Sequence, residues 1–155
     1  MKNAIEMLKE DHRKVKGLLE ELTQSTARAE KKRRQLLEKI EQELELHTHI
    51  EEEIFYPAFK EAGNSEYAKT YFEAVEEHRA VNEMVLPDLK NTEPTSEKFS
   101  GRAKVLKELI EHHVEEEEKE MFKMARKAFS SDELQELARQ MSERKQELQK
   151  QMRAA

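Results

Sequence analysis

The sequence predicts an all-α protein: an up-down-up-down four-helix bundle with an additional C-terminal helix. Charged residues make up 40% of the 155 residues and apolar residues 36%, with only 3 Gly and 3 Pro. This balance is typical of long amphipathic helices rather than sheets. Apolar residues recur at helical spacing along five stretches, and short polar segments separate them. The length suits one domain with a sizeable core.

The first helix is predicted over residues 4–23. Asn3 is placed to cap it, with Glu6 three residues later as the reciprocal partner. One polar residue, His12, lies on its apolar face, which is formed by Ile5, Leu8, Val15, Leu18 or Leu19, and Leu22. A histidine therefore points toward the predicted core.

The second helix is predicted over residues 29–60. At about 100° per residue, His47 and Glu51 fall in one sector with the apolar residues Leu36, Leu37, Ile40, Leu44, Ile54, Phe55 and Ala58. His49 falls on the opposite face, so helix phase selects His47 as the inward histidine. Phase likewise selects Glu51 over its two acidic neighbours. Pro57 is expected to bend this helix or tighten its last turns, and the basic run 31–34 is expected to be a solvated face.

The third and fourth helices are predicted over residues 66–89 and 97–128. His78 shares the apolar face of the third helix with Tyr71, Phe72, Val75, Val81, Asn82 and Val85. His113 and Glu117 share the apolar face of the fourth, which also holds Phe99, Ala103, Leu106, Leu109, Ile110, Met121, Met124 and Ala128. His112 falls off that face. Each of the four bundle helices thus carries one histidine in phase with its core.

The fifth helix is predicted from Ser130, which has capping-box spacing with Glu133. Its amphipathic face is weak, so we expect it to pack across the bundle or to make an oligomer contact such as a homodimer. The tail beyond about Gln146 is expected to fray. The chain is accordingly divided into a bundle domain, residues 1–129, and a C-terminal helix and tail, residues 130–155, packed on that domain.

Six polar residues lie on otherwise apolar faces, and they predict a two-metal site: His12, His47, Glu51, His78, His113 and Glu117. A single histidine on an apolar face is more often a satisfied core residue, and one His-x-x-x-Glu pair is common by chance in a Glu-rich chain. Four histidines in phase on four helices are hard to explain by chance. Buried carboxylates are paired or bind metal, and facing helices of a bundle supply ligands to one site.

The ligand types restrict the metal and the class of site. The chain has no Cys, so the donors are imidazole and carboxylate, which suit iron, manganese or zinc. The Glu-x-x-His spacing of ferritin-like di-iron bundles does not occur on a core face, and the H-E-x-x-H zinc motif is absent. The Glu runs after His47 and His113 are otherwise interpreted as solvated faces.

Four stretches resemble the hemerythrin-like (HHE cation-binding) domain family over about residues 4–128. They are E-D-H-R-K-V-K-G-L-L around His12, H-T-H-I-E-E-E-I-F-Y-P from His47, E-E-H-R-A-V-N-E-M-V around His78, and H-H-V-E-E-E-E-K-E-M-F from His112. The resemblance implies a hemerythrin-like bundle with an oxo- or hydroxo-bridged pair of Fe ions. It implies the same six ligands, with Glu51 and Glu117 bridging.

Asn82 marks a departure from the oxygen-carrying members, which have a second histidine at that position. The chain therefore resembles a six-ligand subtype, which favours reactivity or sensing over reversible O2 carriage. We expect a non-haem di-iron protein that binds O2, peroxide or nitric oxide, as a sensor or scavenger of oxidative or nitrosative stress or of iron. Any enzyme activity is expected to be catalase- or peroxidase-like, with no single catalytic acid or base. Tyr71, on the same face as His78, is interpreted as core.

Two alternatives remain open: a helical interaction module with a structural metal, and a metal-free interaction protein. Net charge is −6 and the pI is about 5.6, which argues against nucleic acid as the main partner. No stretch approaches the roughly 20 apolar residues of a membrane span, and no signal peptide is evident. These features, with the absence of Cys, lead us to expect a cytoplasmic protein.

Overall fold

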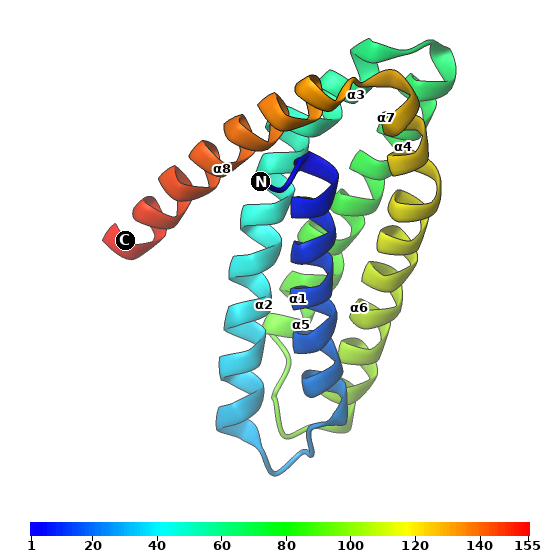
Figure 1. Cartoon of the computed structure of the whole chain (residues 1–155). Coiled ribbons are helices and arrows are strands. Elements are labelled where there is room, and N and C mark those ends of the chain that lie inside the picture. The colour runs from blue at the N-terminus through cyan, green and yellow to red at the C-terminus, as the bar shows by residue number, and fades with distance from the viewer.

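The computed structural model describes all 155 residues and contains only helices and their connections. Four long helices form an up-and-down bundle, and a fifth crosses one end and projects away (Figure 1). The first is α1 (Ala4–Gln24) and the fifth is α8 (Ser131–Ala154). The second to fourth are continuous runs of three elements: α2 (Glu30–Ile50), η1 (Glu51–Phe55) and α3 (Tyr56–Ala62); α4 (Ser65–Arg79), η2 (Ala80–Val85) and α5 (Leu86–Lys90); α6 (Glu97–Glu116), η3 (Glu117–Met121) and α7 (Phe122–Ala128). The predicted fold class is confirmed.

The segments η1, η2 and η3 are π-helical turns, in which an N–H bonds to the carbonyl five residues earlier. The pairs are Tyr56 to Glu51, Leu86 to Val81, and Phe122 to Glu117. Pro57 and Pro87 follow the first two turns. A proline ring clashes with the carbonyl four residues earlier in an α-helix, and a wider turn lets the helix continue through it. The turn before Pro57 is therefore wider than an α-helical turn, so the predicted tightening at Pro57 is wrong.

Side-chain caps fix the helix starts that the sequence predicted. Asn3 accepts a hydrogen bond from the Glu6 N–H at 2.9 Å, but the predicted reciprocal bond to the Glu6 side chain is not formed. Ser130 and Glu133 form the reciprocal capping box, with distances of 3.1 and 2.8 Å. These bonds satisfy backbone donors that have no partner inside a helix.

The apolar core consists of two clusters with a polar layer between them. One cluster, near α8, contains Ile50, Phe55, Phe59, Phe122 and the α8 residues Leu134, Leu137 and Met141. The other, toward the opposite end, contains Val15, Leu44, Val81, Phe99, Leu106 and Ile110. In every bundle helix, the predicted inward histidine lies where one cluster gives way to the other. The buried polar residues therefore occupy one level of the bundle.

Arg33 is an exception to the solvated basic face expected at residues 31–34. Its side chain is only 2% exposed. The guanidinium donates to the carbonyls of Pro94 and Ser25 at 2.6 and 2.8 Å and lies over the Phe99 ring. Two chain connections at the end of the bundle farthest from α8 are thereby tied together. Helix phase missed this because the partners lie in loops.

Helix α8 packs its apolar face, including Leu134, Leu137 and Met141, against the bundle and contacts α1, α2 and η1. It remains helical to Ala154, so the fraying predicted beyond Gln146 is not seen. In Figure 1 it runs obliquely past the bundle to the C-terminus, and its C-terminal half still contacts the bundle through Arg144 with Glu53 and Lys145 with Asp11. None of the helices is both long and apolar enough to cross a membrane.

Candidate metal centre

The structure brings all six predicted site residues into the polar layer. His12 comes from α1, His47 from α2 and His78 from α4, while His113 comes from α6. The two glutamates, Glu51 and Glu117, are the first residues of η1 and η3. Glu51 is fully buried, and the other five are between 2% and 8% exposed.

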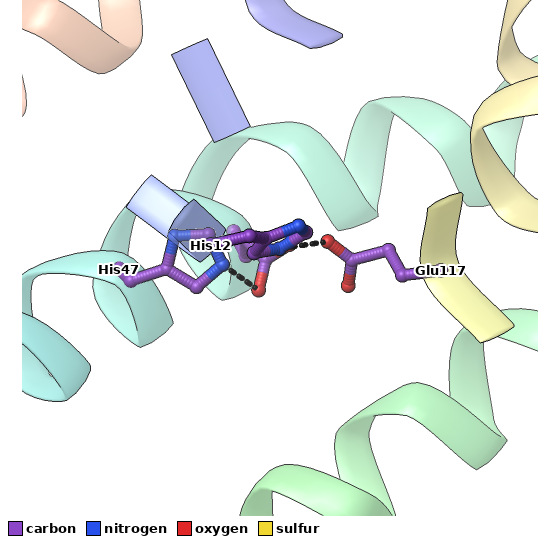
Figure 2. Close-up of side chains that lie close together, drawn as sticks. His12, His47 and Glu117 are labelled. Atoms are coloured by element: carbon purple, nitrogen blue, oxygen red, sulfur yellow. Dashed lines mark ion pairs between the residues drawn. The ribbon is translucent and has the colours of Figure 1, made fainter. Parts of the chain in front are cut away.

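The six side chains form two four-residue groups that share both glutamates. One group is His12, His47, Glu51 and Glu117; the other is His78, His113, Glu51 and Glu117. In each, one donor atom per residue lies within 4.8 Å of all the others. The four imidazole Nε2 atoms lie 3.0–3.1 Å from a carboxylate oxygen of Glu51 or Glu117. Figure 2 shows the His12 ring paired with the Glu117 carboxylate and the His47 ring beside His12.

The donor atoms fit a pair of cations. His12 Nε2, His47 Nε2, Glu51 Oε2 and Glu117 Oε1 are buried without a hydrogen-bond partner, an arrangement that is costly unless a cation lies among them. Two groups of donors that share both glutamates therefore suit two cations.

An outer carboxylate binds the Nδ1 atom of every one of the four imidazoles. The pairs are His12 with Glu118 at 2.7 Å, His47 with Asp11 at 3.0 Å, His78 with Glu52 at 2.7 Å, and His113 with Glu77 at 2.7 Å. With the Nδ1 proton donated outward, each Nε2 lone pair faces the centre, as metal ligation requires. Such carboxylates orient the ring and increase its basicity.

Sequence analysis missed these four carboxylates and interpreted two of them, Glu52 and Glu118, as part of solvated faces. A simple signal could have found them. Each is adjacent in sequence to a site residue of its own helix, and each supports an imidazole of another helix. A side chain about 100° from the core direction lies at the seam between helices, where it reaches the neighbour's ring.

The carboxylates hold the imidazoles protonated when no metal is bound. Burial alone would lower the pKa of His113, but hydrogen bonds to Glu117 and Glu77 outweigh it and raise that pKa to about 10. The same balance of burial against carboxylate contacts raises the pKa of His12, His47 and His78. Two divalent ions carry the charge of four protons, so metal can replace these protons without changing the charge of the layer.

Tyr56 is a further residue of the centre, which the sequence analysis did not single out. Its hydroxyl donates to Glu117 Oε2 at 2.5 Å and Glu51 Oε1 at 3.2 Å. It also lies 3.3 and 3.4 Å from the Nε2 atoms of His78 and His113. Burial and the two carboxylates raise the pKa of this phenol well above its usual range. The Y-P of the second family-like stretch was the available signal.

Tyr71 and the out-of-phase histidines lie outside this constellation. The Tyr71 ring packs edge-on against Tyr56, with centroids 6.3 Å apart. The His49 and His112 side chains are 42% and 64% exposed, and each pairs with a glutamate four residues later on its own helix. Helix phase therefore separated inward from outward histidines correctly.

A cavity of about 30 Å³ lies against all four imidazoles. Its other walls include the apolar residues Val15, Leu44, Val81, Ile110 and Val114, with Thr48 and Asn82 as its uncharged polar residues. Asn82 donates to Thr48 Oγ1 at 3.2 Å. A water needs roughly 10–15 Å³ of such volume, so the cavity has room for a ligand of about two heavy atoms.

Comparison with known proteins decides the family. The model of the hemerythrin HHE cation-binding domain matches residues 3–125. The chain belongs to this family. As an HHE domain it carries buried His and Glu clusters suited to a metal site, and the resemblance seen in the sequence is confirmed.

A solved structure agrees with this assignment, and curated proteins are similar to the chain over most of its length. The HHE protein's fold matches the crystal structure of an HHE cation-binding domain-containing protein, the Rv2633c homolog from Mycobacterium kansasii, with a TM-score of 0.82 and 30% identity over 95% of this chain and 87% of that one. Uncharacterized protein Rv2633c of Mycobacterium tuberculosis is 29% identical over 94% of this chain and 87% of its own length. A protein named DNA nickase from Nostoc sp. is 27% identical over 97% of this chain. The chain spans only 41% of that relative.

Proposed function

We propose that this HHE protein is a non-haem di-iron protein that binds O2, peroxide or nitric oxide and scavenges or senses one of them. The observation that carries the proposal is a pair of His2Glu2 groups sharing two glutamates beside a cavity of about 30 Å³. A donor set of imidazole and carboxylate without thiolate suits iron or manganese. The cavity admits a ligand of two heavy atoms and excludes larger substrates.

Each residue has a role that follows from its position. Two imidazoles would bind each metal ion as terminal ligands. The outer carboxylates fix the tautomer of each ring. Glu51 and Glu117, which belong to both groups, would be shared by the two metal ions. When bound, two iron ions supply electron transfer and Lewis acidity toward oxygen ligands. The apolar cavity wall excludes bulk water from the imidazole face.

Tyr56 supplies a donor on the side where Asn82 replaces a histidine. Its oxygen lies 2.5–3.4 Å from all four donor atoms of the His78 group, the spacing of neighbouring ligands around one ion. We therefore assign Tyr56 to the His78/His113 position. The His12/His47 position then has fewer protein donors and is the side left open to a small ligand.

The test is metal analysis combined with peroxide turnover. Protein purified without chelators is expected to hold two irons per chain and to release one O2 for every two peroxide molecules consumed, as disproportionation requires. His47→Ala is expected to abolish both properties, because it removes a terminal donor and leaves Glu51 without that partner. His49→Ala, an exposed neighbour in the same stretch, is the matched control.

The outcomes separate the alternatives. Two irons without any reaction with peroxide, O2 or nitric oxide would favour the interaction module with a structural metal. Absence of metal, with unchanged folding after chelation, would favour the metal-free interaction protein. Retention of two irons by His47→Ala would contradict the assignment of the site.

A further inference from the structure

Helix α8 reaches the metal centre through one chain of contacts. It lies outside residues 3–125, the part of the chain that the family model matches. Lys145 of α8 donates to Asp11 Oδ1 at 2.7 Å. The other oxygen of Asp11 lies 3.0 Å from His47 Nδ1, and His47 Nε2 lies 3.0 Å from Glu51 Oε1. Two side chains, those of Asp11 and His47, thus connect a cation on α8 to a glutamate shared by both groups.

Only one of the four outer carboxylates is capped in this way. Glu118, Glu52 and Glu77 form no ion pair with a lysine or arginine, and their side chains are 24–36% exposed. The Asp11 side chain is 10% exposed and is bound by Lys145. Charge interactions are screened least where water is excluded. The charge of Lys145 therefore acts on the His47 imidazole through a carboxylate that water screens less than the other three.

We propose that Lys145 is a positioning residue that increases the difference between the two metal positions, because it weakens the His47 imidazole as a ligand of the His12/His47 position. This inference rests on the proposed function. Helix α8 thereby becomes a tuning element of the centre rather than only a cover for the core.

The physical basis is competition for the Asp11 carboxylate. A carboxylate that accepts the Nδ1 proton increases the donor strength of the imidazole. An ammonium bound to the same carboxylate draws its charge away, so His47 donates less. The positive charge also opposes a nearby metal ion directly, and it opposes the more highly charged oxidised ion more strongly. Both effects loosen metal at one position and raise its reduction potential.

The test compares Lys145→Met, Lys145→Arg and Arg144→Met in the full-length protein. Arg144 is the matched control: it lies next to Lys145, its side chain is 28% exposed against 24%, and it binds Glu53, which supports no site histidine. Metal content is measured first. Release of each of the two ions to a chelator and the midpoint potentials are then recorded.

Lys145→Met is expected to slow release from one of the two positions by roughly ten-fold, the lower end of what outer-ligand changes do, and to lower one midpoint potential. Lys145→Arg and Arg144→Met are expected to behave like the wild type. A purely structural role for Lys145 predicts the opposite sign, because a loosened α8 would release metal faster.

The results distinguish this inference from the proposed function. Wild-type protein without two bound metals overturns both. Two bound metals in every variant, with release and potential unchanged or release accelerated in Lys145→Met, overturn only the role of Lys145. Equal effects of Lys145→Met and Arg144→Met would also overturn it, since only Lys145 contacts the partner of a site histidine.

Discussion

At the scale of single residues, every imidazole of the centre lies between two carboxylates, one at Nδ1 and one at Nε2. The inner pair, Glu51 and Glu117, is buried and shared by both metal positions. The outer set belongs to neighbouring helices. Each ring is therefore fixed in orientation before metal arrives, which reduces the reorganisation that binding requires.

Tyr56 gives a spectroscopic prediction at this scale. A phenolate bound to oxidised iron produces a charge-transfer band in the visible range, and carboxylate and imidazole ligands do not. Tyr56→Phe is therefore expected to keep two irons and to lose that band, as recorded by absorption of the oxidised protein. Tyr71→Phe is the control, since its ring packs against Tyr56 and Phe72 and it belongs to neither group of donors. A visible spectrum that is unchanged in Tyr56→Phe would contradict the ligand role.

At the scale of elements, sequence predicted the five helices and the inward histidines and glutamates, but it wrongly placed Phe72 and Leu109, which are exposed, on core faces. It also did not predict the π-helical turns. Helix phase chose His47 over His49 because the α-helical period holds from Leu36 to Glu51. Beyond Glu51 the period fails: five residues at 100° place Tyr56 about 140° from Glu51. The π turn of η1 brings it back to the centre. A phenol two helical turns from His47 could not be assigned from an α-helical pattern.

The capping box at the start of α8 gives a stability prediction. Ser130→Ala removes the acceptor of the Glu133 N–H, which costs about 1 kcal/mol. For a domain of this size that lowers Tm by roughly 2–4 °C, measurable by thermal denaturation. Ser142→Ala, in the middle of the same helix, is the control. No loss of stability in Ser130→Ala would show that apolar packing alone holds α8 in place.

At the scale of the whole molecule, the polar layer divides the core into two apolar clusters. The charges in this layer make stability depend on pH when metal is absent. The pKa of His113 is about 10 in the folded state and near 6.5 in an unfolded chain. Because the folded state binds this proton more tightly, the raised pKa stabilises the folded protein fully at pH values below the pKa of the unfolded chain. This stabilisation is lost as the pH rises through the pKa of the folded state.

Metal-free protein is therefore expected to lose stability between about pH 6.5 and pH 10. The raised pKa values of His12, His47 and His78 act in the same direction. Metal-loaded protein is expected to lack this loss, because metal has replaced the protons. Urea denaturation at several pH values, with and without a chelator, measures both. Rising stability of the metal-free form over that range would contradict the protonated imidazoles.

Because of the π turn at η1, the angular phase of the side chains along the second bundle helix changes at Glu51. Removing Glu53, an exposed residue of that turn, would restore one continuous α-helical frame. Tyr56 would then follow Glu51 by four residues, about 40° away on an α-helix, and would still face the centre. Pro57 would meet an unrelieved clash with the carbonyl four residues earlier, although no ligand had been substituted. The extra residue of the π turn therefore lets a proline follow the centre directly while the phenol keeps its place.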